Sequence, residues 1–254
     1  MIALKEPWEL DVMRTAGRKL ALIVARLREQ VAVGMETREL DRLTESLILE
    51  AGAKPAFKGY KVGKAVFPAT ICVSLNEQVV HGIPSRRRLE AGDVVSLDFG
   101  LSYGGYFADT AFSVLMEGGS AEDAALLQAT EESMHLGIAK ARVGARVGDI
   151  GHTVEGHVRK SGLGVVKAFV GHGIGRALHE EPSVPNYGKA GTGPLLKAGM
   201  VLAIEPMITR GGEETKILAD KWTVVTKDGS RSAHFEHTVA VTPAGPEILT
   251  RLVA

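Results

Sequence analysis

The octet AGDVVSLD, residues 91–98, occurs again as AGMVLAIE, residues 198–205, without a gap and with a carboxylate at the end of each copy. Side chains along a β-strand point alternately to its two faces. In the first copy the aliphatic Val95 and Leu97 therefore lie on one face, and Asp98 lies on the other. Each octet predicts a strand that carries its acid opposite its aliphatic side chains.

The repeated octet is one of three matches between two parts of the chain. The others pair VHGIP (80–84) with GHGIG (171–175) and AVGMETREL (32–40) with RVGARVGDI (142–150). Because the three matches occur in the same order, they indicate a duplication. We expect one domain over residues 1–254, built from pseudo-symmetric halves at about 8–118 and 119–250.

Hydrophobic periodicity predicts the other elements of an α+β fold. Apolar residues at helical spacing predict helices at residues 8–30, 35–52, 121–141 and 147–161. Alternating patterns predict a hairpin of the strands 93–100 and 106–115, and further strands over 165–171, 200–208, 222–227 and 233–242. The order of helices, strands, helices and strands agrees with a duplication.

Asp109 and Glu236 lie on predicted strands in the same way as Asp98 and Glu205. Their neighbours on the same strand face are mostly small residues, which leaves room beside each of the four acids. We therefore expect the four carboxylates to point into open space rather than into a packed core.

The hairpin brings two of these acids together. If Tyr103 and Gly104 form its two-residue loop, Asp98 lies directly opposite Asp109, with Cβ atoms ~5 Å apart. Two carboxylates so close in apolar surroundings repel each other, so either a cation lies between them or one acid keeps its proton.

A metal centre accounts for all four acids at once. Together they carry four negative charges, which two divalent cations neutralise. Oxygen ligands with one imidazole suit a hydrolytic centre whose two metals lie ~3.5–4 Å apart. The alternatives are charges on the edge of a sheet or an acid pair that shares a proton.

Composition excludes several other classes of protein. The 30 basic and 30 acidic residues give a formal net charge of zero, so nothing favours direct binding of nucleic acid or an anionic membrane. Cys72 is the only cysteine, which fits a reducing compartment. With no signal-peptide pattern and no apolar run long enough to span a bilayer, we expect a cytoplasmic protein.

The chain resembles the type I methionine aminopeptidases along nearly its whole length. The motifs that carry the resemblance are NEQVVHGIP (76–84), LDFG (97–100), GYFADTAF (105–112), GHGIGRALHEEP (171–182), IEPM (204–207) and FEHTVAVT (235–242). The resemblance implies a pita-bread fold, in which duplicated halves form a curved antiparallel sheet covered by helices. It also implies removal of the initiator methionine from nascent proteins, with a preference for a small second residue.

The resemblance assigns a role to each candidate polar residue. It implies two divalent ions, of Co, Mn, Fe or Zn, held by Asp98, Asp109, His172, Glu205 and Glu236. Asp109 and Glu236 bridge the ions, and Glu205 also acts as the general base for the attacking water. His179 donates a hydrogen bond to the scissile carbonyl oxygen. His81 contacts the substrate nitrogen and helps proton transfer to the leaving amine.

The resemblance further implies an apolar slot for the methionine side chain. Its walls are Tyr60, Phe67, Cys72, Leu178 and Trp222, with Phe57 nearby. Leucine at 178, phenylalanine at 67 and the extended loop 61–66 depart from the family pattern, which leaves the width of the slot open. By analogy, a monovalent cation is expected near Asn76 and Ser232.

The expected partners are the N-termini of nascent polypeptides and, transiently, the ribosome; we expect a monomer. Two other interpretations of the motifs remain. The glycine-rich run could be a dinucleotide loop, although GHGIGRA lacks the GxGxxG spacing. Cys72 could be a nucleophile paired with His81 rather than a small buried thiol.

Two rival functions also remain. An X-Pro peptidase of the same fold usually carries a long additional N-terminal domain. A non-catalytic module that binds ribosomes, RNA or chromatin proteins typically lacks metal ligands and has basic tails.

Overall fold

The structure, a computed structural model, describes residues 2–252. Its α-helices are α1 (Pro7–Gln30), α2 (Thr37–Glu50), α3 (Ala121–Ile138) and α4 (Val147–Val158), followed by the short 3₁₀-helix η1 (Arg159–Ser161). All four predicted helices are confirmed. Each begins at a residue that accepts or donates capping hydrogen bonds; at α3, for example, the Ser120 side chain accepts a hydrogen bond from the Asp123 amide.

The strands of the first half of the chain are β1 (Lys54–Pro55), β2 (Lys61–Val62), β3 (Ala65–Val66), β4 (Cys72–Leu75), β5 (Gln78–Val80), β6 (Val94–Tyr103) and β7 (Tyr106–Leu115). Those of the second half are β8 (Gly164–Val165), β9 (Gly171–Gly173), β10 (Glu180–Val184), β11 (Val201–Ile204), β12 (Met207–Thr209), β13 (Thr215–Ile217), β14 (Val224–Thr226), β15 (Ser232–His234), β16 (Glu236–Thr242) and β17 (Gly245–Ile248). Each region predicted to be a strand contains at least one observed strand, but most of these regions also include residues outside any strand.

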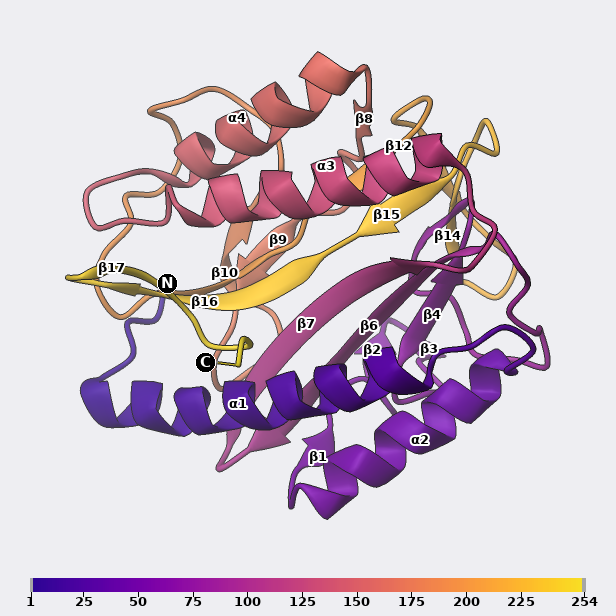
Figure 1. Cartoon of the computed structure of the whole chain (residues 1–254). Helices are drawn as coiled ribbons and strands as arrows, with labels where there is room; N and C mark the ends of the chain where they lie inside the picture. Colours follow the sequence, from indigo (N-terminus) through magenta and orange to yellow (C-terminus); the bar gives the residue numbers. More distant parts are fainter. Residues whose placement is uncertain (1, 253–254) are drawn as a thin grey trace.

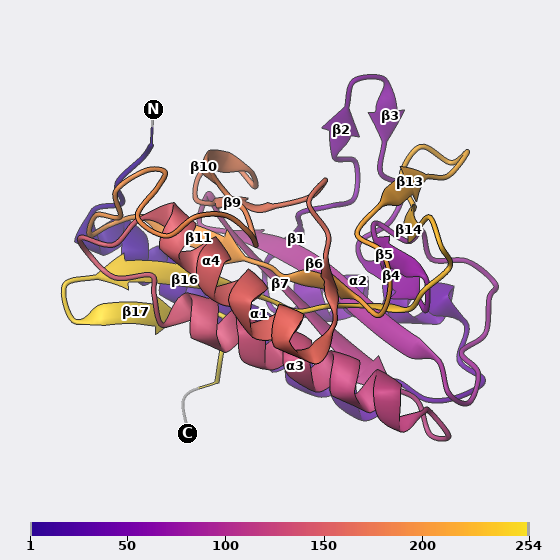
Figure 2. The ribbon, with the colours of Figure 1, turned by 90° about the horizontal axis from the view of Figure 1, so that it is seen from above.

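The main sheet is antiparallel and has the strand order β1-β6-β7-β16-β11-β9-β10, with β4 paired to β6 and β17 paired to β16. The long strands β6, β7 and β16 curve side by side across the molecule (Figure 1). Helices α1 and α2 lie beside the strands of the first half, and α3 and α4 beside those of the second. The turned view shows α1 and α3 on one side of the sheet and the hairpin β2–β3 on the other (Figure 2).

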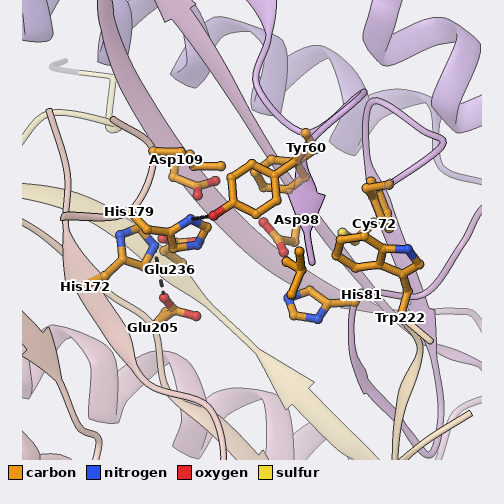
Figure 3. A pocket seen from close by; sticks show the side chains of 14 residues that line it. Tyr60, Cys72, His81, Asp98, Asp109, His172, His179, Glu205, Trp222 and Glu236 are labelled. Atoms are coloured by element: carbon orange, nitrogen blue, oxygen red, sulfur yellow. Dashed lines mark hydrogen bonds and ion pairs between the residues drawn. The ribbon is translucent and has the colours of Figure 1, made fainter. Parts of the chain in front are cut away.

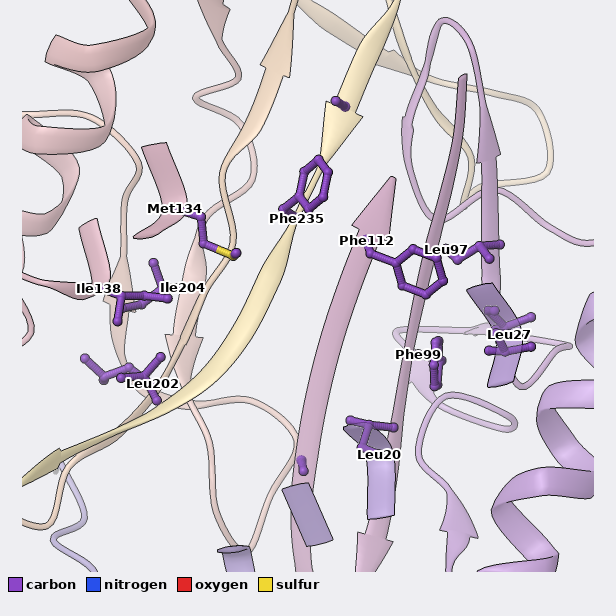
Figure 4. Packing of buried hydrophobic residues seen from close by; sticks show 14 of the residues in the cluster. Leu20, Leu27, Leu97, Phe99, Phe112, Met134, Ile138, Leu202, Ile204 and Phe235 are labelled. Atoms are coloured by element: carbon purple, nitrogen blue, oxygen red, sulfur yellow. The ribbon is translucent and has the colours of Figure 1, made fainter. Parts of the chain in front are cut away.

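The core lies between the sheet and these helices. Leu97 and Phe99 of β6, and Leu202 and Ile204 of β11, belong to one buried cluster that also includes Leu20 of α1. Figure 4 shows two parts of this cluster: Leu20, Leu97 and Phe99 in the first half, and Leu202 and Ile204 beside Met134 and Ile138 of α3 in the second. The predicted alternation is therefore confirmed: Leu97, Leu202 and Ile204 pack with the helices, and the acids lie on the opposite face, which they share with Val201.

The register of the β6–β7 hairpin differs from the prediction. Asp98 lies opposite Ala111, and Asp109 lies opposite Gly100, so the two acids are diagonal neighbours on one face rather than a direct pair. The loop consists of Gly104 and Gly105, with φ of 59° and 83°. A tight hairpin turn of type I′ needs positive φ at both central residues, and two glycines meet this need better than Tyr103 and Gly104.

Within residues 2–252, no helix is long and apolar enough to cross a membrane.

Two helical glycines make a matched test of the packing. A Cβ atom at Gly17 of α1 would collide with the backbone carbonyl of Leu249, whereas a Cβ at Gly156 of α4 would meet no atom within 4 Å. We expect Gly17→Ala to lower the free energy of unfolding by about 1–3 kcal/mol, because the helix must move away from the chain behind it. Gly156→Ala should raise it by up to about 1 kcal/mol. Urea unfolding of both variants measures the difference; equal effects would contradict the close approach of α1 to Leu249.

Candidate metal centre

The polar face of the sheet gathers the five residues predicted to hold metal. Five neighbouring strands, β6, β7, β16, β11 and β9, supply one residue each. In that order the residues are Asp98, Asp109, Glu236, Glu205, which directly follows β11, and His172. Because these strands are adjacent, residues far apart in the sequence meet on one surface (Figure 3).

Small residues keep this surface open. Ala111 lies opposite both Asp98 and Glu236, and Ala203 lies opposite both His172 and Thr238. With alanine between them, the longer side chains reach the same space without packing against a neighbour. The sequence-based expectation of room beside the acids is confirmed.

The side chains converge closely enough to share an ion. One ligand atom from each of Asp109, His172 and Glu236 lies within 4.8 Å of the other two. The Nε2 atom of His172 lies 3.5 Å from Oε1 of Glu205. One oxygen of Asp98 and one of Glu236 are buried without any hydrogen-bond partner among the described residues. Buried carboxylate oxygens are costly unless something positive meets them, so these orphaned atoms fit a cation site.

Electrostatics leads to the same conclusion. Burial raises the pKa of Asp109 to about 7. The pKa values of Asp98, Glu205 and Glu236 lie well above their usual range, because burial removes water and the neighbouring acids add repulsion. The cluster therefore needs either protons or cations, and a set of carboxylates with one imidazole fits divalent transition ions.

His172 is held in the form that can bind a metal. Its Nδ1 lies 2.8 Å from the carbonyl oxygen of Gly173, an acceptor, so the proton is on Nδ1 and the Nε2 lone pair faces the acids. Burial lowers the pKa of His172 to about 4, which keeps the ring neutral. A Cβ atom at Gly171 or Gly173 would collide with backbone of the adjacent strands β11 and β10, so glycine on both sides lets β9 fit between them.

His179 lies above this cluster, with its ring 4.3 Å from that of His172. Burial lowers its pKa, so it is neutral near pH 7. The next residue, Glu180, fixes the loop: one of its oxygens accepts a hydrogen bond from the Ala177 amide, and the other pairs at 2.6 Å with the buried ammonium of Lys5. The segment before α1 therefore stabilises the loop that carries His179.

His81 lines the same pocket but is held differently. It has a φ of 60°, which non-glycine residues seldom adopt and which is typical of strained functional positions. The next residue must be glycine, because a Cβ atom at Gly82 would collide with the Val73 carbonyl of β4. The ring contacts Phe169 edge to face, and burial lowers its pKa to about 4.

The apolar residues predicted for the methionine slot line one end of the pocket. Phe57, Tyr60, Phe67, Cys72, Leu178 and Trp222 are all present there, and Val62 of the β2–β3 hairpin is an additional wall that sequence reasoning missed. The rings of Phe67 and Trp222 meet edge to face at 5.2 Å. All the predicted site residues therefore lie around a single pocket.

Sequence analysis also missed two polar neighbours of Glu205. The buried Asn186 donates a hydrogen bond to the backbone oxygen of Glu205. Nε2 of His234 lies 3.6 Å from Oε2 of Glu205, and neither ring nitrogen of His234 has a hydrogen-bond partner within residues 2–252. The residues proposed for a monovalent cation are adjacent, since the Ser232 amide donates to the Asn76 carbonyl, but the cation itself stays a prediction.

Cys72 is buried, and burial beside Asp98 raises its thiol pKa, which disfavours a nucleophilic role.

Known proteins resemble the chain in sequence and in structure. A model of metallopeptidase family M24 matches residues 11–243. Methionine aminopeptidase 1 of Bacillus subtilis is 47% identical over 252 residues, which cover 99% of this chain and all of the relative. Methionine aminopeptidase of Clostridium perfringens is 49% identical over 250 residues, covering 98% of this chain and 99% of the relative.

Solved structures give the same result. The structure of methionine aminopeptidase from Thermotoga maritima superimposes with a TM-score of 0.96 at 39% identity, covering 99% of this chain and 100% of that one. The prolidase of Pyrococcus furiosus shares the fold alone, with a TM-score of 0.77 at 22% identity over 66% of its length. The predicted α+β pita-bread fold is confirmed, and the chain belongs to metallopeptidase family M24.

Proposed function

We propose that this chain is a metal-dependent aminopeptidase that removes the initiator methionine from new polypeptides and prefers a small second residue. The observation that carries the proposal is the convergence of four acids, three of them buried, and one neutral imidazole beside an apolar slot. Relatives named methionine aminopeptidase at 47–49% identity over nearly the whole chain support the same activity.

The five residues would hold two divalent ions, and the acids would offset the charge of both. Asp98 and His172 lie at opposite ends of the group, whereas Asp109 and Glu236 come from the adjacent strands β7 and β16 between them and suit a bridging role. When bound, such ions acidify water and polarise a carbonyl group.

The protein's own groups would carry the proton transfers. The Glu205 carboxylate, between the imidazoles of His172 and His234, would accept the proton of the attacking water. His179 would donate to the carbonyl oxygen as it gains negative charge. His81 would lie at the substrate nitrogen and help deliver a proton to the leaving amine.

The slot would select methionine. Aromatic rings and a thiol suit a flexible thioether side chain. The rings of Tyr60 and His179, with centroids 5.2 Å apart, both line the pocket, so a bulky second residue would have to fit beside them; this supports a preference for a small one.

The setting of the reaction stays a prediction. We propose that the protein works as a monomer in the cytoplasm on nascent N-termini, with transient contact to the ribosome, and that residues 8–118 and 119–250 are the two halves of one domain. Matching glycines support the duplication: Gly34 and Gly144 both have φ near 90° and donate to Leu89 and Leu196, respectively.

The activity is tested directly with short peptides. Chelated protein, restored in turn with Mn²⁺, Fe²⁺, Co²⁺ and Zn²⁺, should release methionine from Met-Ala-Ser with at least one ion and act poorly on Met-Phe-Ser. An Ala-Pro peptide should be cut slowly, because alanine does not fill the slot. Preference for Ala-Pro would favour an X-Pro peptidase, and no activity with any ion would favour a non-catalytic module.

Metal binding should depend on pH. In metal-free protein the Asp109 pKa of about 7 exceeds its usual value of 3.8, so its contribution to stability is present at low pH and lost as pH rises through about 7. Cations replace the protons, so Mn²⁺ should raise Tm more at pH 8 than at pH 5.5. Thermal unfolding with and without Mn²⁺ measures this gain at each pH. In Asp109→Asn the gain should shrink; an unchanged gain would place the ion elsewhere.

A further inference from the structure

Tyr60 makes a polar contact that its place in the apolar slot does not require. Its hydroxyl oxygen lies 2.7 Å from Nδ1 of His179, as the dashed line in Figure 3 shows. The two residues are 119 positions apart in the sequence. Their rings are tilted against each other with centroids 5.2 Å apart, so the contact has packing as well as a hydrogen bond.

The backbone around Tyr60 holds the hydroxyl in place. Tyr60 precedes β2, and its amide donates to the Phe57 carbonyl at 2.8 Å. Its own carbonyl accepts from the Phe67 amide at 2.8 Å, beyond β3, which closes the base of the hairpin. Phe57 and Phe67 also meet edge to face. Tyr60 is therefore held through both its amide and its carbonyl at the base of the hairpin β2–β3, which projects from the rest of the molecule (Figure 2).

The hydrogen bond decides which ring nitrogen of His179 carries a proton. A neutral imidazole has one N–H and one lone pair. A phenol ordinarily titrates at about pH 10, so the Tyr60 hydroxyl keeps its proton at neutral pH and is able to donate it. If the phenol donates to Nδ1, the N–H of His179 is on Nε2. The opposite arrangement would turn a lone pair toward a carbonyl oxygen and repel it.

We propose that Tyr60 is a positioning residue for His179: its hydroxyl donates to Nδ1 and keeps the N–H on Nε2, aimed at the substrate oxygen. The proposal rests on the proposed function of the site, and it gives Tyr60 a role in the chemical step beyond forming a wall of the slot.

Removing only the hydroxyl tests this role. Tyr60→Phe keeps the ring and the wall, so KM for Met-Ala-Ser should stay within about twofold. One lost hydrogen bond of typical strength should lower kcat about tenfold. In a His179→Ala background the same substitution should have no further effect, because the hydroxyl acts only through that ring.

Tyr103→Phe is the matched control. Tyr103 ends β6, has the Lys19 ammonium over its ring and does not line the pocket, so kcat should be unchanged. A fall in kcat of equal size in the control would overturn the proposal. So would a rise in KM with constant kcat in Tyr60→Phe, which would make the hydroxyl a part of the slot only, or an undiminished effect in the His179→Ala background.

A spectroscopic measurement does not depend on turnover. In Zn²⁺-loaded protein labelled with ¹⁵N-histidine, the His179 signals are identified by their loss in His179→Ala. They should show a protonated Nε2 and an unprotonated Nδ1, and Tyr60→Phe should produce a mixture of tautomers. Protonated Nδ1 in the unsubstituted protein would overturn the proposal. If that protein fails to cleave Met-Ala-Ser, the proposed function fails, and the tautomer still reports on the Tyr60 contact separately.

Discussion

The mutual repulsion of four clustered carboxylates, three of them buried and that of Glu205 half-buried, is the constraint on which the candidate site depends. Taking one unpaired charge out of water already costs several kcal/mol, and neighbouring charges of the same sign add to that cost. Asp98, Asp109, Glu205 and Glu236 are nevertheless gathered on one face, where some of their oxygens have no partner among the described residues. Such an arrangement is favourable only when protons or cations neutralise it. The site thus gains its stability from what it binds, as expected for a centre shaped for cations.

The rest of the fold makes this gathering possible. Five adjacent antiparallel strands bring one residue each, and the aliphatic residues on their other face pack against the helices. Alanine at 111 and 203 leaves room beside the polar side chains. Glycine at 171 and 173 lets the neighbouring strands approach closely. The helices therefore stabilise the sheet from one side only. The pocket lies on the other side, and none of the residues that line it belongs to a helix.

Sequence patterns predicted the faces of the strands because alternation follows from strand geometry alone. The predicted register of β6 and β7 was wrong because the loop was placed at Tyr103 and Gly104, whereas Gly104 and Gly105 carry the stronger local signal for the turn. The shift of two residues kept both acids on the correct face. The family resemblance named all the site residues that the structure gathers around the pocket except Val62, although their roles stay proposals. The contact of Tyr60 with His179 and the unbonded ring of His234 were missed. Both depend on contacts between segments that are far apart in the sequence, which leave no local signal.

The two matching histidine motifs show how similar sequences come to differ in chemistry. His172 lies inside the regular strand β9, and its Nδ1–H bond to Gly173 turns the lone pair of Nε2 toward the acids. His81 has a left-handed backbone after β5, and its ring lies among Phe169 and Trp222 on the apolar side of the pocket. Burial lowers the pKa of both rings to about 4, so charge does not distinguish them. Backbone conformation does: one conformation suits a metal ligand, and the other places an imidazole where the peptide would lie.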